Sequence, residues 1–600
     1  MKIYQYVANF LFNKGIKDVF VIEGSASAGL VVGVSEIKGM NYYCSHHEQA
    51  GSFCVDAYAK TTGKVAVMIA TSGPGGQNCL NGIAASYYDS VPAIYITGQV
   101  NSRFIKPSNK IRQHGFQECD IVSMSSPITK YSTLVRETKM ISYELEKAYH
   151  LATTGRQGPV LLDIPMDIQQ SEYIEGEQLD YCPEEDNVKL NELSPELIDI
   201  YNLIKKSERP VILVGGGVQL SQANKLMHEF ISITGIPFFV TWNMIDFCDN
   251  NYNLFGGRVG TYGGDGRNFG IQNADLLIAI GSRISGRITG GVVDSFARCA
   301  NKVIVDIDAY ELQYQQVKGD INIVSDAKYF LKLMINILKN EKPKFNFESW
   351  RKKIKYWKTE FAVFPKEYML NANVVNPYYF IKNLSESLDS NAIMVYEAGG
   401  NCVVTSQAFE AKQGQRLFSN NGNSSLGYAL PASIGASISS KMQDVICITG
   451  DGGMNFNIQE LQTIKHHSLP IKIFIFNNYV YGITKAYRET NYNSNYAGVD
   501  SDHGISNPNF INIAKAYGIK AISISNDLEV DKIINQVLDF DGPVVCDVNM
   551  KNMYDYKPRL GWGVPIEEQY PFLDRKQFIQ NMIIEPYEGW EDPVYPGKSG

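Results

Sequence analysis

The sequence has few of the features that mark membrane, metal-framework or nucleic-acid-binding proteins. Its ten cysteines form no Cys-x-x-Cys pair, so we expect buried, reduced thiols and no disulfide or zinc scaffold. The eight histidines show no metal-ligand spacing. A formal net charge of −8 argues against a nucleic-acid surface. No apolar run approaches the roughly 18–20 residues that span a bilayer.

The first residues also lack a targeting signal. MKIYQYVANFLFNKGIKDVF has neither a long apolar core nor a small-residue cleavage site. We therefore expect a cytoplasmic protein that binds neither membrane nor nucleic acid. The composition, 44% hydrophobic and 20% charged, is that of a globular protein, and 600 residues predict two to four domains.

Three stretches of the chain alternate strand-like and helical patterns. We predict an α/β protein with three doubly wound parallel-sheet domains, over residues 1–175, 196–340 and 375–550. The clearest apolar strands are KVAVMIA (64–70), VPAIYITG (91–98), GPVLLDIP (158–165), RPVILVGGGV (209–218), DLLIAIGSR (275–283), KVIVDID (302–308) and GPVVCDVNM (542–550).

The stretches between these domains carry little apolar periodicity. We expect linkers at 184–196 and 338–360, and a C-terminal tail over the surface at 551–600. The first and third domains each have a glycine-rich turn after a strand and close on a GPV strand. This likeness is consistent with duplication, and equally with any two doubly wound sheets.

The stretch CITGDGGMNFN (447–457) places an aspartate between glycines directly after an apolar run. DVICITG (444–450) and IKIFIFNN (471–478) read as parallel strands joined by a helix. Asp451 and Asn478 then end neighbouring strands at one edge of the sheet. A carboxylate and an amide oxygen beside a glycine-rich anion cradle suit Mg²⁺ and a phosphate. For the aspartate alone, a simple helix cap is the competing interpretation.

Gly450-Asp451-Gly452 followed by Asn477-Asn478 resembles the thiamine diphosphate signature of the acetolactate synthase-like decarboxylases and carboligases. The resemblance runs over nearly the whole chain. It implies thiamine diphosphate held through Mg²⁺, with the Asp451 and Asn478 side chains and the Val480 carbonyl as metal ligands. The further cofactor-binding positions that it implies in the third domain are Gly399, Gly400, Asn401, Leu426, Gly450, Gly452, Gly453, Tyr481, Gly482 and Ile483.

The resemblance implies a specific role for Leu426 and for Asn401. Leu426 would force the cofactor's two rings into a bent conformation, although a core leucine is the simpler interpretation. Where the family has Gly-Gln-His, this chain has Gly399-Gly400-Asn401. The asparagine can still donate to a phosphate oxygen, and the replaced pair is a departure from the family.

CSHHEQAGSFCVDAYAKTTG (44–63) predicts a helix that begins near Glu48 and stops at Gly63. On its own, Glu48 reads as an acid favoured by the helix dipole. The resemblance implies that its carboxyl hydrogen-bonds the cofactor's pyrimidine and promotes deprotonation of the thiazolium. Other first-domain positions implied for the site are Gly24, Gly73, Pro74 and Asn78 around the cofactor, and Phe116 and Gln117 as catalytic candidates in the donor pocket.

In the resembled family the pyrimidine-binding and diphosphate-binding domains of one site belong to different subunits. The resemblance therefore implies a homodimer or homotetramer with its sites at the subunit interface. An isolated subunit would then be inactive.

GSRISGRITGG (281–291) resembles the flavin-binding segment of acetolactate synthases. Arginine suits a pyrophosphate because its fork pairs two oxygens at once. The resemblance implies FAD in a non-redox role, although the GGG turn alone could equally serve packing. The positions implied are Arg156, Gly215, Gly216, Gly217, Thr241, Gly257, Gly281, Arg283, Arg287, Asp306 and Asp326.

The leading interpretation is a thiamine diphosphate-dependent lyase or transferase. It would decarboxylate a 2-oxo acid, with pyruvate as the expected donor, and transfer the acyl-anion equivalent to a carbonyl acceptor. Acyl transfer to a keto sugar and simple decarboxylation are alternatives. An inactive nucleotide-binding subunit is a third, which the presence of Glu48, Asp451 and Asn478 disfavours.

Three departures from acetolactate synthases fall near the expected acceptor. Met166 stands in place of a lysine, Glu23 in place of a proline and Tyr487 in place of a tryptophan. Losing a cation and gaining an anion should disfavour a second negatively charged 2-oxo acid and favour a neutral or bulkier acceptor. In the alternative interpretation, Met166 only fills space and Tyr487 stacks as tryptophan would.

Overall fold

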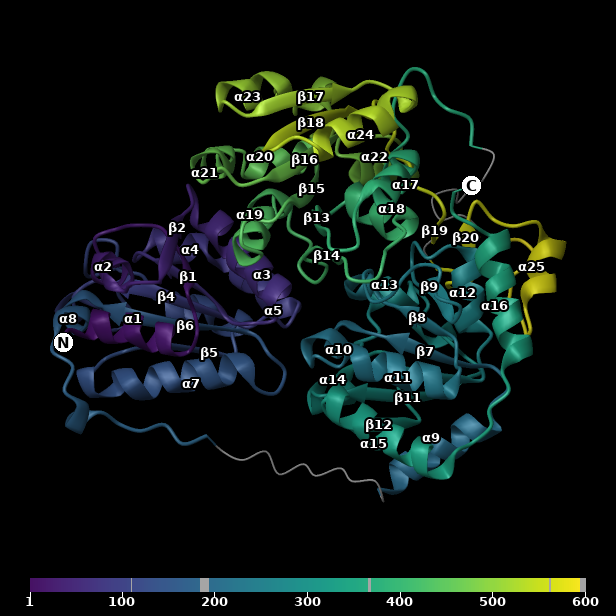
Figure 1. The fold of residues 1–600 in the computed structure, drawn as a ribbon, viewed down its shortest axis with the longest axis horizontal. Helices are drawn as coiled ribbons and strands as arrows, with labels where there is room; N and C mark the ends of the chain where they lie inside the picture. The colour runs from purple at the N-terminus through teal and green to yellow at the C-terminus, as the bar shows by residue number, and fades with distance from the viewer. Residues whose placement is uncertain (109, 184–193, 365–367, 561–562, 594–600) are drawn as a thin grey trace.

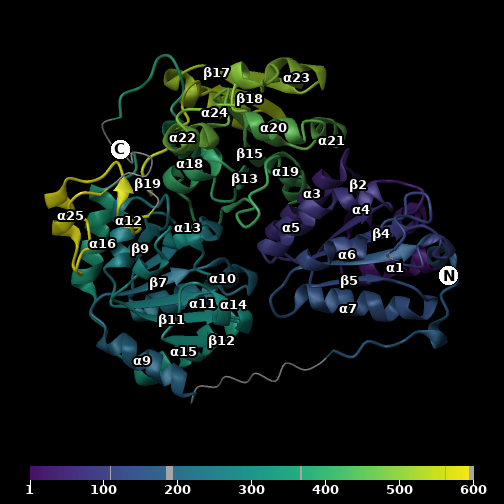
Figure 2. The ribbon, with the colours of Figure 1, turned by 180° about the vertical axis from the view of Figure 1, so that it is seen from behind.

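The computed structural model describes residues 1–108, 110–183, 194–364, 368–560 and 563–593. They form three six-stranded sheets in which every neighbouring pair of strands is parallel, with helices between the strands (Figures 1 and 2). The predicted fold class is confirmed. The expected linker at 184–196 lies outside the described residues except for its last three positions.

The first domain holds the sheet order β2-β1-β3-β4-β6-β5. Alternate strand residues face opposite sides, so Val67 and Ile69 pack under α1, α2 and α7 while Ala66 and Met68 pack under α3 and α5. The strands are β1 (Asp18–Val21), β2 (Asn41–Cys44), β3 (Ala66–Ala70), β4 (Ala93–Gln99), β5 (Tyr131–Leu134) and β6 (Pro159–Pro165). The helices are α1 (Ile3–Asn13), α2 (Ala28–Glu36), α3 (Glu48–Thr62), α4 (Pro74–Asn78), α5 (Leu80–Tyr88), α6 (Ile121–Ser125), α7 (Ile141–Thr153) and α8 (Met166–Gln170).

The third domain repeats this topology with the order β14-β13-β15-β16-β18-β17. Counted within each domain, both sheets run 2-1-3-4-6-5, which supports the duplication interpretation. The strands are β13 (Ile393–Tyr396), β14 (Arg416–Phe418), β15 (Val445–Gly450), β16 (Ile471–Asn477), β17 (Lys520–Ile524) and β18 (Val544–Asn549). The helices are α17 (Pro377–Ser387), α18 (Gly400–Ala408), α19 (Ala429–Ser439), α20 (Asp451–Phe456), α21 (Glu460–His466), α22 (Gly482–Asn491), α23 (Phe510–Ala516) and α24 (Val530–Leu538).

The middle domain has a different order, β12-β11-β10-β7-β8-β9. The chain reverses direction across the sheet between β7 and β10, and ligands of such sheets bind at this switch point. The strands are β7 (Pro210–Val214), β8 (Phe238–Val240), β9 (Phe255–Arg258), β10 (Leu276–Ile280), β11 (Asn301–Asp306) and β12 (Ile321–Val324). The helices are α9 (Pro195–Lys206), α10 (Gly216–Leu220), α11 (Asn224–Thr234), α12 (Asp265–Gln272), α13 (Gly286–Thr289), α14 (Ala309–Tyr314) and α15 (Ala327–Glu341).

The charged stretch 338–360, expected as a linker, is mostly helical and packed. It contains the end of α15 and all of α16 (Glu348–Glu360), which lies against α12 and β9. Trp350 and Trp357 are buried, and their Nε1 atoms donate to the Pro210 carbonyl (3.0 Å) and to Asn581 Oδ1 (2.8 Å). Lys352 and Lys355 lie on the exposed face of α16 while Trp350, Ile354 and Trp357 are buried, so the charged stretch is an amphipathic helix.

Helices α3 and α19 join the first domain to the third. A Cβ on Gly435 of α19 would lie 2.1 Å from the Cys54 carbonyl oxygen of α3, so the two backbones meet where only glycine fits. The apolar core beneath these helices is continuous between the two domains. This contact fixes how the two sheets stand relative to one another.

The C-terminal residues run from the third domain onto the middle domain (Figure 1). They include β19 (Arg559–Leu560), β20 (Gln569–Tyr570) and α25 (Arg575–Asn581). The expected tail is therefore partly buried: Glu567 is 0% exposed and pairs with Arg298 at 2.7 Å. Among the described residues, no helix is both long and apolar enough to cross a membrane.

We expect Arg298→Ala to destabilise the protein, because it leaves the buried Glu567 carboxyl without its cation. Loss of one partner of a buried pair typically costs about 3 kcal/mol. A matched control is Lys339→Ala, which removes the exposed Lys339–Glu229 pair of the same domain and should have much less effect. Urea unfolding measures both. Equal stability of the two variants would show that Glu567 does not hold the tail through Arg298.

Candidate cofactor site

The third sheet gathers the predicted phosphate and metal residues at one edge. β13, β15 and β16 are neighbours, and α18, α20 and the Asn478 turn follow their carboxyl ends. The switch point of this sheet lies between β13 and β15. The prediction that Asp451 and Asn478 end adjacent strands at the same edge is confirmed.

Asp451 is buried and its carboxylate organises this edge. Oδ1 accepts from Gly452 N (2.8 Å), and Oδ2 accepts from Tyr479 N (2.7 Å) and Asn507 Nδ2 (2.9 Å). Burial raises the pKa of the carboxyl to about 6, so a cation at this place would stabilise its charged form. Asn507 was missed by the sequence analysis, since nothing in its own neighbourhood marks it.

Asn478 and Val480 complete the turn beside Asp451. Asn478 Oδ1 accepts from Val480 N at 3.2 Å. One carboxylate, one amide and one backbone carbonyl suit Mg²⁺, which keeps its remaining positions for phosphate and water. Within the described chain no cluster of three or more histidine, cysteine or acidic side chains could hold a metal, which is compatible with such a set.

The glycines of this edge let other side chains of the protein come close to the backbone. A Cβ on Gly450 would lie 3.0 Å from Asn401 Nδ2, so Asn401 reaches the turn that was predicted to bind phosphate. A Cβ on Gly400 would overlap the ring of Tyr556 at 2.2 Å. Tyr556 belongs to the tail and was not predicted, because it lies about a hundred residues after the motif.

Glu397 is a buried carboxyl that sequence reasoning missed. It is 0% exposed, and burial raises its pKa to about 7. Oε1 accepts from Tyr428 N (3.3 Å) and Oε2 from Ala429 N (3.2 Å), so it caps the start of α19. A Cβ on Gly453 would lie 2.9 Å from Oε2. The sequence does carry a sign of this residue, because Glu397 directly follows a strand and precedes Gly399 and Gly400.

The first sheet gathers the other predicted residues at its own carboxyl edge. Glu48 begins α3 as predicted, and its Oε2 accepts from Asn78 Nδ2 at 3.0 Å. The helix ends at Gly63, whose φ of 67° gives it the left-handed conformation of a helix stop. A Cβ on Gly73 would lie 2.7 Å from the Gln117 carbonyl oxygen. A Cβ on Gly24 would lie 2.5 Å from Thr71 Cβ, three residues before Pro74 at the start of α4.

Among the described residues of one chain, Glu48 and Asp451 make no direct contact with each other. The hydrogen bonds and close contacts of the Glu48 carboxylate are with Asn78 and Gly75, and those of Asp451 stay in the third domain. Between the two domains, His46 N donates to Glu460 Oε1 (2.9 Å). No hydrogen bond or ion pair of the described residues connects Glu48 to Asp451 or Asn478.

Two of the three residues predicted near the acceptor, Glu23 and Met166, also lie at the first edge. Glu23 follows β1 and is exposed, and Met166 begins α8 after β6. Gln169 Nε2 donates to the Ala26 carbonyl (2.8 Å) and ties the loop after β1 to α8. Phe116 is 86% exposed. Tyr487 lies on α22 of the third domain with about half of its surface exposed.

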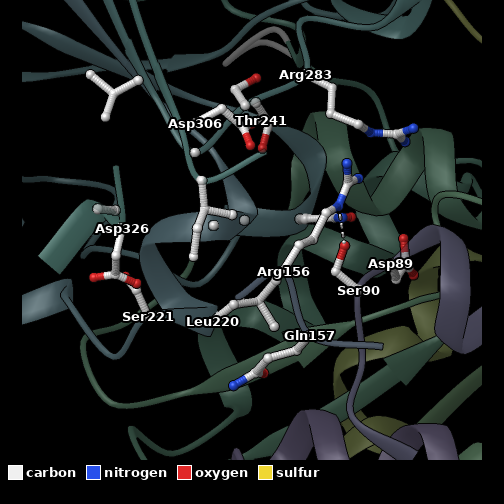
Figure 3. Close-up of a pocket in the computed structure, with 18 of the residues that line it drawn as sticks. Asp89, Ser90, Arg156, Gln157, Leu220, Ser221, Thr241, Arg283, Asp306 and Asp326 are labelled. Carbon is white, nitrogen blue, oxygen red and sulfur yellow. Dashed lines mark hydrogen bonds between the residues drawn. The ribbon is translucent and has the colours of Figure 1, made fainter. Parts of the chain in front are cut away.

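A cavity of about 870 Å³ opens at the switch point of the middle sheet (Figure 3). Its lining includes nine of the eleven positions expected for a flavin: Arg156, Gly216, Gly217, Thr241, Gly281, Arg283, Arg287, Asp306 and Asp326. Gly215 and Gly257 are not among the lining residues. A Cβ on Gly215 would lie 2.2 Å from the Gly281 carbonyl oxygen, so this glycine allows two strand ends to approach.

Charged side chains of both signs line this cavity. Arg156 pairs with Glu311 (2.6 Å) and Asp308 (3.2 Å), and its Nε donates to Ser90 Oγ (3.1 Å; Figure 3). Arg287 lies over the Trp242 ring at 4.8 Å. Asp326 caps α15 by accepting from Lys328 N. The volume and the arginines fit a phosphate-bearing nucleotide.

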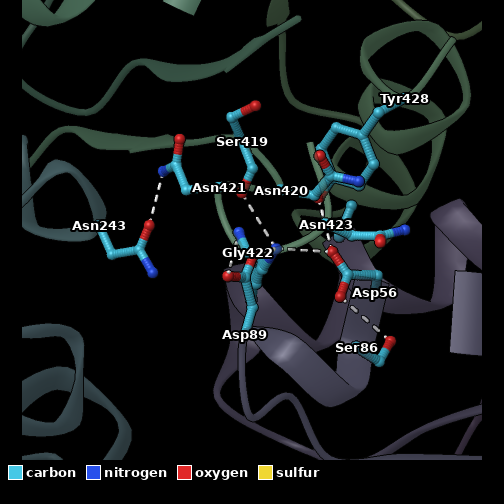
Figure 4. Close-up of polar contacts among 12 residues, drawn as sticks. Asp56, Ser86, Asp89, Asn243, Ser419, Asn420, Asn421, Gly422, Asn423 and Tyr428 are labelled. Atoms are coloured by element: carbon cyan, nitrogen blue, oxygen red, sulfur yellow. Dashed lines mark hydrogen bonds and ion pairs between the residues drawn. The ribbon is translucent and has the colours of Figure 1, made fainter. Parts of the chain in front are cut away.

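A polar cluster joins all three domains beside this cavity (Figure 4). Lys60 Nζ contacts Asp56 (2.8 Å) and Asp89 (2.7 Å) and donates to the Ser419 carbonyl (3.0 Å). Burial alone would lower the pKa of Lys60, but the two carboxylates raise it above its usual value. Asp89 Oδ1 also accepts from Gly422 N at 2.9 Å.

The same cluster positions the segment that leads to Leu426. Asn421 Nδ2 donates to Asn243 Oδ1 of the middle domain (2.5 Å), and Asn421 and Gly422 line the cavity (Figure 4). Tyr428, two residues beyond Leu426, donates to Asp56 Oδ2 at 2.6 Å. Leu426 thus follows a segment that contacts both neighbouring domains.

Comparisons with known proteins agree with this division of the chain. Residues 1–124 match the thiamine pyrophosphate enzyme N-terminal TPP binding domain, residues 197–334 the central domain, and residues 397–548 the C-terminal TPP binding domain. The chain is 33% identical over 537 residues to an acetolactate synthase large subunit of Cyanidium caldarium, covering 88% of each chain. It is 34% identical over 550 residues to a chloroplastic acetolactate synthase of Arabidopsis thaliana, covering 90% of this chain and 80% of that one.

We expect thiamine diphosphate to raise the melting temperature only when Mg²⁺ is present, because Asp451 and Asn478 would reach the phosphates through the ion. Asp451→Ala should abolish this shift. The exposed Asp541, before β18, provides a control variant, Asp541→Ala, that should keep it. A full shift in EDTA, or in Asp451→Ala, would refute the metal assignment.

Proposed function

The chain belongs to the acetolactate synthase-like family of thiamine pyrophosphate enzymes, and we propose that it decarboxylates pyruvate and joins the remaining two-carbon unit to a carbonyl acceptor. The observation that carries this proposal is the preservation of both half-sites. In the third domain Asp451, after β15, accepts from the backbone of the Asn478–Val480 turn, after β16, and in the first domain Glu48 meets Asn78.

The third domain would hold the cofactor's diphosphate. Asp451, Asn478 and the Val480 carbonyl would bind Mg²⁺, and Asn401 with the turn around Gly450 would contact the phosphate oxygens. When bound, thiamine diphosphate supplies an electron sink for the pair of electrons released with CO₂. Glu397, which caps α19, would keep the glycine turn in place.

The first domain would supply the acid. Asn78 donates to Glu48 Oε2, which leaves Oε1 to hold a proton at the cofactor's pyrimidine nitrogen. The likeness to a family whose two half-sites come from different subunits supports a site completed by a second copy. We therefore infer a homodimer, or a higher assembly that contains it.

The donor pocket and the acceptor side would differ in charge. Phe116 and Gln117 follow the cofactor edge, as in the resembled family, and support pyruvate as the donor. Glu23 and Met166 place no cation at the loops where acetolactate synthases have a lysine. An acceptor without a carboxylate next to its carbonyl fits these loops better than a second 2-oxo acid.

The middle cavity would hold FAD without redox chemistry, since pyruvate carboligation moves no net electrons. Its 870 Å³ volume and the three arginines at its rim support this assignment. Through Asn243, Asn421 and Gly422 the bound nucleotide would brace the segment that leads to Leu426.

The catalytic role of Glu48 is tested with the variant Glu48→Gln. This variant keeps the hydrogen bond to Asn78 and removes the carboxyl that would carry the proton. We expect turnover of pyruvate, measured by CO₂ release from the holoenzyme, to fall by about 10²–10⁴. Glu196 is also in the first turn of a helix, α9, and Glu196→Gln is the matched control. Wild-type CO₂ release by Glu48→Gln would leave this glutamate with only a helix-capping role.

The middle-domain assignment predicts that heat-denatured protein releases FAD in near-equal amount to subunits. Flavin fluorescence after removal of the precipitate measures it. Arg156→Met should lower flavin content at limiting FAD, because it removes a guanidinium from the cavity rim. Release of ADP in place of FAD, or no release after reconstitution, would contradict the assignment.

A further inference from the structure

One loop of the first domain is strongly cationic in an otherwise acidic protein. Between Asp89 and Glu118 the sequence has no carboxylate and four cations, Arg103, Lys106, Lys110 and Arg112, although the whole chain has a net charge of −8. These four residues lie in the connection between β4 and α6. We call the described residues 101–108 and 110–114 the basic loop.

The basic loop starts and ends at the carboxyl edge that carries Glu48. At its start, Ser102 N and Oγ donate to Asp167 Oδ1 of α8, at 2.9 and 3.1 Å. At its end, His114 N donates to Glu118 Oε2 at 2.8 Å. Gln117 then contacts the turn at Gly73, where a Cβ would lie 2.7 Å from its carbonyl oxygen. The loop that carries the cations is therefore anchored at both ends at the edge of the candidate cofactor site.

Within the described residues, none of these cations has a carboxylate partner. Arg103, Lys110 and Arg112 are exposed, and Lys106 is half-buried. Arg103 lies over the ring of Phe104 at 4.6 Å, and this ring keeps 41% of its surface exposed. Cations without carboxylate partners, one of them over an exposed aromatic ring, form a surface suited to an anion that also has a less polar part.

We propose that the basic loop binds a phosphate ester on the carbonyl acceptor. This rests on the proposed carboligase function and names its acceptor class, a phosphorylated aldehyde or ketone. Near the reacting carbonyl, Glu23 and Met166 offer no cation, which disfavours a carboxylate there. Farther along the same edge the basic loop supplies several cations, and phosphate groups are bound by such side chains.

The phosphate would take no part in the chemistry. The C1–C2 bond of pyruvate breaks, and CO₂ leaves. A new bond joins the former C2 to the acceptor's carbonyl carbon, and the acceptor oxygen gains a proton. The ester group anchors the acceptor, so its contribution should appear mainly in KM and should weaken as salt screens the charges.

The kinetic test compares D-glyceraldehyde 3-phosphate with D-glyceraldehyde as acceptor for pyruvate. We expect kcat/KM for the phosphorylated acceptor to be about 10–100-fold higher, and this preference to vanish in Lys106→Gln/Lys110→Gln/Arg112→Gln. The matched control is Lys17→Gln/Lys38→Gln/Lys64→Gln, at three exposed lysines before β1, β2 and β3, on the opposite edge of the same sheet. Equal use of both aldehydes, or an intact preference in the basic-loop variant, overturns the proposal.

A binding measurement separates this proposal from the carboligase function. Calorimetry of the holoenzyme with unreactive glycerol 3-phosphate should show binding that weakens at least tenfold in the basic-loop variant and not in the control. If glycerol 3-phosphate binds in this way but no ligated product forms, the phosphate site stands and the carboligase function is rejected. If unphosphorylated aldehydes give product but glycerol 3-phosphate does not bind, the carboligase function stands and the phosphate site is rejected. Dissociation of the variant into single subunits would identify the loop as a subunit contact and overturn the proposal.

Discussion

Parallel strands give each sheet of this protein a direction, and that direction decides where chemistry can occur. Every strand of a parallel sheet ends at the same edge, so the turns that follow the strands meet there. Asp451, Asn478 and Asn401 follow three neighbouring strands of the third sheet. Glu48, Gly73 and Gln117 gather in the same way on the first sheet, and the middle cavity opens at the equivalent edge of the second.

The contact between α3 and α19 fixes how the first and third sheets stand relative to one another. It joins the first and third domains through a continuous apolar core and through close backbone contact at Gly435. The contacts of Glu48 and of Asp451 nevertheless stay within their own domains. Since the family places both half-sites around one cofactor, we infer that two copies pair the edge of one with the edge of the other. The Lys60 cluster then links this arrangement to the middle cavity.

The sequence predicted what depends on local pattern. Helix α3 with its stop at Gly63, the strands β15 and β16, and the meeting of Asp451 with Asn478 all follow from short stretches and from sheet polarity. Contacts between distant segments could not be predicted. Tyr556 reaches Gly400 from the tail, and Lys60 meets Ser419 across a domain boundary. Their own neighbours give no sign of either contact, because the partners are set by how whole domains pack.

Subunit complementation tests the central claim, that one active site uses Glu48 of one chain and Asp451 of another. Glu48→Gln and Asp451→Ala proteins, each inactive with pyruvate alone, would be unfolded together, refolded and loaded with thiamine diphosphate and Mg²⁺. Random pairing should restore about 25% of wild-type turnover per subunit, because half of the dimers contain one intact site. Turnover that stays at the level of the separate variants would contradict a site shared between chains.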